Sequence, residues 1–361
     1  GRLGFIISNK ILSTSGTKKL RSFLINHFSI EEIVDLSDTK LFDAAILPLI
    51  LIATRSKEIP KHITYSLITE SCKNINSEHQ KTDLLTFLKD SSIPLDAHVT
   101  VNGRGFQVQR FITITPSERS NVWTFHNERE NNLLSKLRYQ SACTLGELCE
   151  KISVGLKTTA DNVFIKPMVG DFIRQLELEE KLIYPLLESH NVNRWRCSWN
   201  SQTDLCVLYP HTEQRGKVVP IDLDKYPKTK EYLEKNRTQL EARTYLKESQ
   251  RQWYEIWVHQ SPKDFCQLKI VTPDIAKHNR FALDDRGFFV NGTCFYLILK
   301  DKSSISYYSM LGLLNSKVIE YFHKITSGNS LYAKRFRYWT SYITTYPIPK
   351  KLVAYKRGDL T

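Results

Sequence analysis

The sequence predicts an α/β sheet at the amino-terminal end of the chain, followed by an α+β domain. Within residues 1–70, the first two apolar runs are separated by an amphipathic stretch, and the later runs are separated by turns. This order is typical of a sheet with a crossover helix and an antiparallel edge. Beyond residue 125, helical and strand patterns are mixed without a repeat. Because 361 residues exceed one typical domain, we expect a sheet region at 1–70, a connecting segment at 71–124 and a second domain at 125–361.

The sheet region carries four strand patterns and one helix pattern. The strands are expected at 3–8, 31–36, 46–54 and 62–68. The helix is expected at 17–28 with Ser15 as its cap. Its apolar face is predicted from residues at helical spacing, namely Leu20, Phe23, Leu24 and His27. The chain starts abruptly at Gly1 with a strand pattern, so we interpret the region as the second half of a larger sheet whose earlier elements lie upstream.

The connecting segment is polar and rich in turn signals. A turn is expected at 102–105, before an apolar run at 106–114. Its letters NGRG lack the spacing and the following helix of a phosphate-binding loop. In the second domain, helices are expected at 128–139, 228–253 and 307–323, and strands at 204–209, 269–271, 285–290 and 293–299. Pro227 suits the start of the second helix, and Glu231 can pair with Lys235 inside it.

Charge favours a polyanionic partner. The chain has 51 Lys and Arg against 38 Asp and Glu, a net charge of +13, which favours nucleic acid ahead of a membrane surface. No run of eighteen apolar residues and no signal-peptide pattern occurs, so we expect a cytoplasmic protein without a membrane partner. Seven cysteines without a CxxC pair indicate reduced thiols rather than a disulfide framework.

The stretch 151–166, KISVGLKTTADNVFIK, is predicted to form a strand, a polar loop and a second strand. Lys157 supplies a positive charge, and Thr158 and Thr159 supply hydroxyls that can donate to a phosphate or a base edge. Gly155 would let the backbone approach a partner closely. An ordinary hairpin loop with polar residues facing water remains the alternative.

Two further clusters interleave basic and aromatic residues. The stretch 331–357 contains seven basic residues, seven aromatic residues and no acid. Phosphate contacts are expected there from Lys334, Arg335 and Arg337. The second cluster contains Trp195 and follows a turn, and its expected contacts are Arg194 and Arg196 to phosphate and His190 and Asn191 to base edges. A solvated basic face over an aromatic core is the alternative for the first cluster.

Enzyme signatures are weak. GxSxG, HExxH, P-loop and GxGxxG motifs do not occur. A nuclease carboxylate set could include Asp274, Asp284 and Asp285, but the letters DRG are more simply a turn. We predict no metal site, because His259, His278 and Cys266 lack the spacing of a closed zinc centre.

The order of segments resembles one family, the adenine-specific DNA methyltransferases of restriction-modification systems with a TaqI-like C-terminal specificity domain. The segments that carry this resemblance are GRLGFIISNKIL, KKLRSFLINHFSIEEIVDLSDTKLFDAAILPLILIATR, LGELCEKISVGLKTTADNVFI, YPLLESHNVNRW, EYLEKNRTQLEAR with QWYEIW, LKIVTPDIAKHNRFALDDRGFFVNGTCFYLIL, and YYSMLGLLNSKVIEYFH before YPIPK. The resemblance implies that residues 1–70 are the C-terminal part of a Rossmann-like methyltransferase domain and that residues 125–361 form a target-recognition domain for duplex DNA.

The resemblance also implies which parts this chain lacks. The family's S-adenosylmethionine loop and its Asn/Asp/Ser-Pro-Pro-Tyr/Phe tetrapeptide do not occur, so the chain by itself is expected to be inactive and to bind no cofactor. Phe42, in KLFDAA, matches the ring that stacks on the flipped adenine, with a core phenylalanine as the alternative. Alternative functions are part of a fused restriction endonuclease-methyltransferase, or a non-enzymatic nucleic-acid-binding module of a phage-defence complex.

Overall fold

The computed structural model describes residues 1–37, 39, 46–56, 58, 60–71, 79–81, 96–116, 122–168, 178–247, 249–301, 305–327 and 335–354. The chain forms two compact units, which are described separately. The first comprises Gly1–Tyr139 with Lys324–Phe336, and the second comprises Gln140–His323 with Arg337–Thr361. No helix in the described part of the chain is long and apolar enough to cross a membrane.

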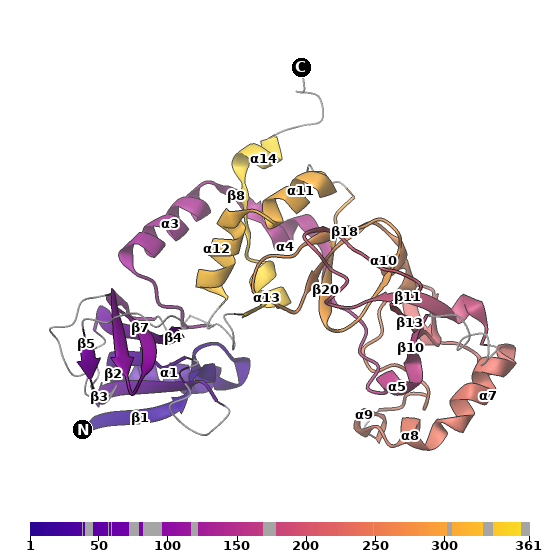
Figure 1. The fold of residues 1–361 in the computed structure, drawn as a ribbon, viewed down its shortest axis with the longest axis horizontal. Helices are drawn as coiled ribbons and strands as arrows, with labels where there is room; N and C mark the ends of the chain where they lie inside the picture. The colour runs from indigo at the N-terminus through magenta and orange to yellow at the C-terminus, as the bar shows by residue number, and fades with distance from the viewer. Residues whose placement is uncertain are drawn as a thin grey trace. The chain divides into compact units, whose positions relative to one another are not determined.

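A seven-stranded sheet dominates the first unit, in the order β1-β3-β2-β4-β7-β6-β5 (Figure 1). Its strands are β1 (Arg2–Ser8), β2 (Phe28–Asp35), β3 (Pro48–Arg55), β4 (His62–Ser71), β5 (His79–Lys81), β6 (Asp96–Val101) and β7 (Arg104–Ile114). β2 and β4 run parallel, as do β5 and β6, and the other neighbours are antiparallel. The four strands expected in residues 1–70 are confirmed. The two later ones, β3 and β4, were expected at an antiparallel edge but lie inside the sheet, and the edge strand that pairs antiparallel with β3 is β1.

Helix α1 (Lys18–His27) covers this sheet with a face that matches the predicted one only in part. Leu24 is buried against β2 and β3 as predicted, together with Ile25, whereas Leu20 and Phe23 are about half exposed. The buried face also contains Arg21, whose guanidinium donates to the Ile11 carbonyl at 2.7 Å. An arginine with such acceptors can be buried, and apolar spacing does not predict it. The helix starts after Thr17, so Ser15 is not its cap.

The segment 71–124, expected to be a connector, instead contributes β5, β6 and β7 to the sheet. β6 and β7 form a hairpin with a two-residue turn at Asn102 and Gly103, both with positive φ (50° and 75°). Val99 and Phe106 from this hairpin are buried with residues of β2 and β4. Helix α3 (Glu128–Tyr139) has the predicted bounds but belongs to the first unit, so the boundary lies after the expected residue 125.

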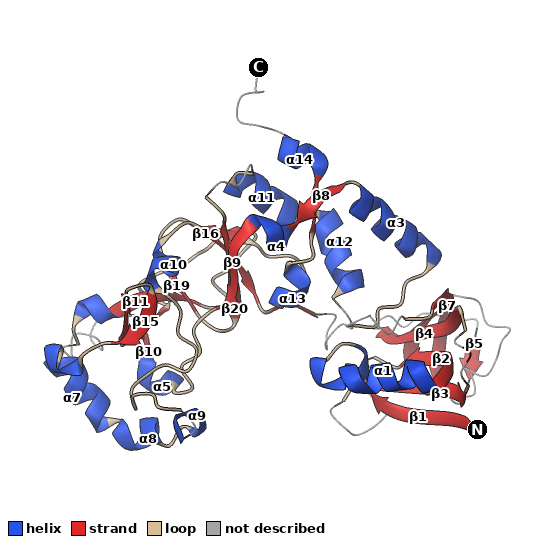
Figure 2. Ribbon diagram, turned by 180° about the vertical axis from the view of Figure 1, so that it is seen from behind, coloured by secondary structure: helices blue, strands red, loops and turns tan. Residues whose placement is uncertain are grey.

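The second unit contains a five-stranded sheet, β12-β18-β16-β20-β9, and a four-stranded sheet, β10-β13-β11-β19 (Figure 2). The first set is β9 (Cys149–Val154), β12 (Trp195–Arg196), β16 (Lys269–Pro273), β18 (Ala282–Asp284) and β20 (Cys294–Leu299). The second set is β10 (Ile165–Pro167), β11 (Ile183–Leu187), β13 (Leu205–Leu208) and β19 (Phe289–Val290). Shorter strands are β8 (Ser141–Thr144), β14 (His211–Gln214), β15 (Lys217–Pro220), β17 (Ile275–Ala276), β21 (Phe336–Arg337) and β22 (Pro347–Pro349). One core cluster joins both sheets.

Two predicted long helices are interrupted by asparagines. The first becomes α7 (Pro227–Lys235), α8 (Arg237–Glu241) and α9 (Thr244–Lys247), with Asn236 between α7 and α8. The second becomes α11 (Tyr307–Leu314) and α12 (Lys317–Thr326). There, the Asn315 side chain accepts from the Phe281 amide at 3.1 Å and donates to its carbonyl at 2.8 Å. An asparagine that bonds to other backbone groups favours a helix break, which helical periodicity does not reveal.

Within these helices, several details are confirmed. Pro227 stands at the first position of α7, and the Glu231–Lys235 ion pair forms at 2.8 Å. Leu233 and Leu240 are fully buried. The remaining short helices are α4 (Leu145–Leu148), α5 (Asp161–Phe164), α10 (Pro262–Cys266), α13 (Thr340–Ile343) and α14 (Lys350–Ala354).

Candidate nucleic-acid interface

The loop that follows β9 is held between two other segments of the second unit. The Leu156 amide donates to the Val290 carbonyl at 2.7 Å, and Lys157 exchanges two backbone hydrogen bonds with Val258, at 3.1 and 3.0 Å. A Cβ at Gly155 would lie 2.3 Å from the carbonyl oxygens of both Val290 and Asn291. Gly155 is therefore needed for close approach to the chain's own backbone, not to a partner as we expected.

After this loop the chain forms helix α5 before β10 begins at Ile165. The apolar residues Val163 and Phe164, predicted to begin a second strand, are buried in that helical turn. The predicted strand-loop-strand pattern is thus corrected to strand, loop, helical turn and strand.

The two loop threonines differ in exposure. Thr158 is 1% exposed, its hydroxyl donates to Asp161 and accepts from the Ala160 amide, and its carbonyl accepts from Arg243. A base contact from Thr158 is contradicted by this burial, because the hydroxyl is already used inside the fold. Thr159 is exposed and lies at φ 56°, a conformation unfavourable for a β-branched residue. Its hydroxyl donates to the Thr158 carbonyl at 2.6 Å.

Arg337, one of the predicted phosphate contacts, is paired with a carboxylate. The Arg337 guanidinium lies 3.0 Å from the Asp274 carboxylate, and the Tyr338 amide donates to the Asp274 carbonyl at 2.8 Å. Burial raises the pKa of Asp274, while the charges of Arg337 and Lys157 oppose that rise. Arg337 also lies over the Trp339 ring, 5.2 Å from its centroid.

The loop at 190–196 presents an exposed tryptophan between two exposed arginines. Trp195 is 50% exposed and lies at φ 86°, and its amide donates to the Phe281 carbonyl at 3.0 Å. Arg194 lies 3.6 Å from Glu320, and Arg196 is exposed. A bulky residue at positive φ is strained, and such strain often occurs at binding sites. Trp195 was part of the cluster recognised in the sequence but was not among the predicted contacts.

The two polar residues predicted to contact bases in this loop have different surroundings. Asn191 is buried, with its amide oxygen accepting from the Glu188 amide at 2.8 Å and its amide nitrogen donating to the Ser198 carbonyl at 3.0 Å. This position contradicts a base contact, because Asn191 holds the loop instead. His190 is exposed, and its ring nitrogens lie 3.6 Å from Glu188 and 3.3 Å from Asp204.

Arg280 is a further basic residue that the sequence did not single out. It directly precedes Phe281, whose carbonyl accepts from the Trp195 amide at 3.0 Å and whose ring lies 6.0 Å from that of Tyr338. Burial raises the pKa of Tyr338, and the charges of Arg280 and Arg194 oppose that rise. Tyr338 directly follows Arg337 in the chain. Only tertiary contacts reveal that these segments meet.

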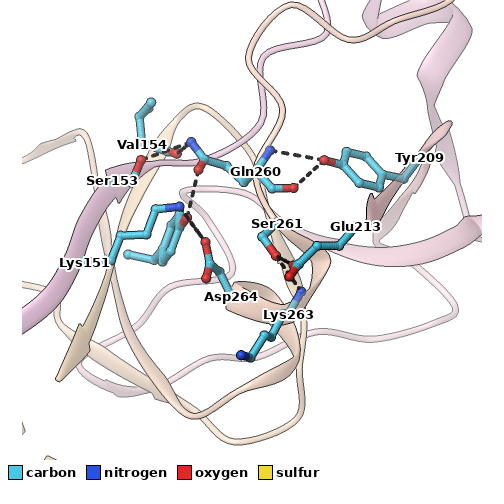
Figure 3. Close-up of polar contacts among 10 residues, drawn as sticks. Lys151, Ser153, Val154, Tyr209, Glu213, Gln260, Ser261, Lys263 and Asp264 are labelled. Atoms are coloured by element: carbon cyan, nitrogen blue, oxygen red, sulfur yellow. Dashed lines mark hydrogen bonds and ion pairs between the residues drawn. The ribbon is translucent and has the colours of Figure 1, made fainter. Parts of the chain in front are cut away.

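A polar network supports the base of the loop that contains Lys157. Figure 3 shows Gln260 at its centre, donating to the Ser153 hydroxyl and the Val154 carbonyl at 3.0 and 2.9 Å. The Gln260 carbonyl accepts from the Tyr209 hydroxyl at 2.5 Å. Lys151 pairs with Asp264 at 2.5 Å. Satisfied buried networks of this kind favour one well-defined arrangement.

The other predicted contacts are spread over the chain. Arg335 is exposed and falls in the first unit, whereas Arg337 falls in the second. Phe42 and Lys334 lie outside the described residues. The nuclease alternative loses support, because Asp284 is buried in an ion pair with Lys269 at 2.5 Å and Asp274 pairs with Arg337.

A TaqI-like C-terminal specificity domain is the family whose model matches residues 184–348. This range contains the loop at 190–196, called the tryptophan loop from here on, and also Arg280, Asp274 and Arg337. Part of the second unit is therefore similar to a TaqI-like C-terminal specificity domain, in agreement with the resemblance suggested by the sequence.

Two curated relatives extend the similarity beyond this domain. The chain is 31% identical over 99% of its length to the type II methyltransferase M.BanIII of Aneurinibacillus aneurinilyticus, and it covers 62% of that protein. It is 23% identical over 82% of its length to the type II methyltransferase M.BstVI of Geobacillus stearothermophilus, and it covers 50% of it. The chain thus spans about half to two thirds of the length of these relatives.

Among solved structures, the type IIL restriction-modification enzyme MmeI in complex with DNA matches with a TM-score of 0.51 and 13% identity. This match covers 94% of the present chain and 38% of the MmeI chain. The likeness concerns the fold, which in this chain is a mixed α/β architecture.

Proposed function

We propose that this chain is the DNA-recognition part of a site-specific adenine-N6 DNA methyltransferase of a restriction-modification system. The observation that carries the proposal is the exposed Arg194-Trp195-Arg196 loop inside the matched specificity domain. Arginines neutralise phosphates or read guanine, and an exposed aromatic ring offers apolar contact. The net charge of +13 adds long-range attraction for the duplex.

Within this interface, the geometry supports distinct contributions. Arg194 and Arg196 are proposed as phosphate or guanine contacts, and Lys157 and Arg337 as additional phosphate contacts. Arg335, in the first unit, is proposed as a separate phosphate contact. Arg337 retains donors beyond the one directed at Asp274, since a guanidinium has five. His190 and Thr159 remain candidates for base edges because both are exposed.

Methyl transfer itself is proposed to depend on sequence upstream of Gly1. Type II methyltransferase relatives imply S-adenosylmethionine as the cofactor, which would supply the methyl group. In the first unit, the carboxylate of Asp35 is not available to hold this cofactor. Asp35, at the carboxyl end of β2, is fully buried and accepts from the Ser37 amide at 2.8 Å and the Tyr65 hydroxyl at 3.2 Å, so its carboxylate is already used. We derive no step of the reaction through the cofactor.

In the complete enzyme, Phe42 is proposed to stack on the adenine once that base leaves the duplex. A base inside a stacked duplex cannot reach a catalytic pocket, and an aromatic ring replaces part of the lost stacking. In a polypeptide that includes the upstream elements, Phe42→Ala should reduce both base extrusion and methylation. A fluorescent adenine analogue at the target position measures the extrusion.

DNA binding tests the proposal directly. The affinity of the chain for duplexes containing a randomised site is measured over a range of salt concentrations. The double variant Arg194→Ala/Arg196→Ala should bind more weakly, with a salt slope reduced by up to about two. The matched control is Lys230→Ala, which removes an equally exposed cation of α7 paired with Asp224. If the double variant keeps the wild-type affinity and slope, the tryptophan loop is not the interface.

A second candidate is part of a fused restriction endonuclease-methyltransferase. The likeness in fold to MmeI, a restriction-modification enzyme, favours it. Both candidates share the same DNA-recognition role for this chain. Duplex cleavage by the complete polypeptide distinguishes them, because a methyltransferase alone leaves the strands intact.

A further inference from the structure

Three side chains with metal-binding atoms converge in the second unit, away from the exposed loops described above. They are His211, the first residue of β14, and Glu255 and His259, from the segment before α10. One ligand atom from each lies within 4.8 Å of the others. The two imidazole rings stack with centroids 5.0 Å apart and an interplanar angle of 20°.

His211 lacks the hydrogen bonds that a buried histidine normally makes. Its side chain is 0% exposed, and neither ring nitrogen has a hydrogen-bond partner among the described residues. The nearest carboxylate oxygen, from Glu255, is 3.7 Å from Nε2 and therefore beyond hydrogen-bond distance. A neutral imidazole carries one N–H and one lone pair, so leaving both unsatisfied in the interior is costly. The ring is aimed at two other ligand groups instead.

The donor set suits a transition-metal ion. Two imidazoles and one carboxylate occur together as protein ligands of zinc. The Gln252 amide donates to Oε1 of Glu255 at 2.7 Å, which holds this carboxylate in place while its other oxygen, Oε2, faces His211.

We propose that His211, Glu255 and His259 bind a divalent transition-metal ion of the zinc class. Imidazole nitrogens favour such ions over magnesium and calcium, which prefer oxygen ligands. Bond lengths of about 2.0 to 2.1 Å place the ligand atoms of a tetrahedral zinc site about 3.4 Å apart. Metal binding would therefore draw the three side chains together by about 1 Å. The sequence did not predict this site, because His211 is remote along the chain from the other two ligands.

The position of the cluster gives the metal a structural role. Val258, between the two ligands of the second segment, makes both backbone hydrogen bonds to Lys157. Gln260, directly after His259, bonds to the Val154 carbonyl at 2.9 Å. An ion that joins β14 to the segment 255–259 would therefore fix the surface against which the Lys157 loop is paired. This inference does not depend on the proposed DNA recognition.

Calorimetry with zinc and absorption spectroscopy with cobalt test the site on the chelator-treated chain. We expect one equivalent of Zn²⁺ to bind, a tetrahedral Co²⁺ spectrum and a zinc-dependent rise in Tm. His259→Ala removes a ligand that is only partly buried and should fold. It should weaken zinc binding by at least about a hundredfold, since outer-sphere partners alone contribute about 10- to 100-fold.

Controls separate the site from general histidine or carboxylate binding. His190→Ala removes an exposed imidazole that also lies near two carboxylates and should leave zinc binding unchanged. Glu255→Gln keeps the size of the side chain and should weaken binding. Without metal, the Tm of His259→Ala reports whether the variant folds. The proposal is overturned if the wild-type chain binds no stoichiometric zinc, or if folded His259→Ala and Glu255→Gln bind it as tightly as wild type does.

Discussion

The two loops of the second unit that were expected to contact DNA are built in different ways. The loop at 155–160 is paired with backbone on both sides, and its Thr158 is buried. The loop at 190–196 also has a buried brace, Asn191, but it exposes Arg194, Trp195 and Arg196. The first loop therefore mainly supports the fold while exposing Lys157, and the second exposes more of the side chains that are proposed to contact DNA.

The largest effect is expected from a methyl group at Gly155. Gly155→Ala places a Cβ 2.3 Å from two backbone carbonyl oxygens, which cannot move as a flexible side chain could. Denaturant unfolding should show a loss of at least about 3 kcal/mol. As a control, Gly312→Ala in α11 meets no atom within 4 Å and should stabilise by up to about 1 kcal/mol. Equal stability of the two variants would contradict a supporting role for the first loop.

A substitution at Trp195 in the second loop should weaken DNA binding while leaving the stability of the fold nearly unchanged. Trp195→Gly removes the exposed ring but suits φ 86°, so the free energy of unfolding should change by less than about 1 kcal/mol. Affinity for duplex DNA should fall by about 2 kcal/mol, the loss typical of an interface aromatic. Binding and unfolding measured on the same preparation separate the two effects. Retained affinity would show that Trp195 has a structural function only.

The two neighbouring threonines, Thr158 and Thr159, test whether the buried side chain of the first loop is the one that stabilises the fold. Thr158→Val removes a hydroxyl that donates to Asp161 and accepts from the Ala160 amide, and should destabilise the chain by about 1 to 2 kcal/mol. Thr159→Val removes an exposed hydroxyl that donates to the neighbouring Thr158 carbonyl, and should cost less, about 0.5 kcal/mol. Thermal unfolding measures both. If Thr159→Val proves the more damaging change, the assignment of the buried threonine as the structural one is wrong.

The smallest effect concerns acid stability at the second loop. Burial raises the pKa of Asp204, but hydrogen bonds from the Asn200 amide and His190 outweigh it and leave the pKa below its usual value. A carboxylate with a lowered folded pKa stabilises the fold above its unfolded pKa, and this stability is lost as pH falls through the folded pKa. His190→Ala should therefore move the midpoint of acid unfolding to higher pH. Acid titration followed by circular dichroism measures the shift, and a midpoint at lower pH would contradict it.

Local patterns predicted much of the fold. The four early strands, helix α3, Pro227 at a helix start and the Glu231–Lys235 pair all follow from spacing along the chain. Features that depend on tertiary partners did not. Asn315 ends a helix because it bonds to the Phe281 backbone, and the hairpin β6–β7 was assigned to a connector because its strands follow a polar stretch.

The sequence indicated the candidate site only in part. Composition and clustering indicated the exposed arginines of the tryptophan loop and Lys157. The sequence does not tell which polar residues of a loop hydrogen-bond to their own backbone, and Thr158 and Asn191 were misassigned for that reason. Asp274 meets Arg337 only through a contact between segments far apart in the chain.

The backbone pairing of the loop at 155–160 has a consequence for engineering new sequence specificities. Because Leu156 pairs with the segment at 290–291 and Lys157 with Val258, this loop cannot be transplanted as a short cassette. A chimaera would have to exchange all three segments together, including the glycine at 155. The tryptophan loop is easier to exchange, because Trp195 and Arg196 pair with a single strand, β18. Libraries that diversify residues 194–196 should therefore yield a larger fraction of folded proteins than libraries of equal size at 155–160.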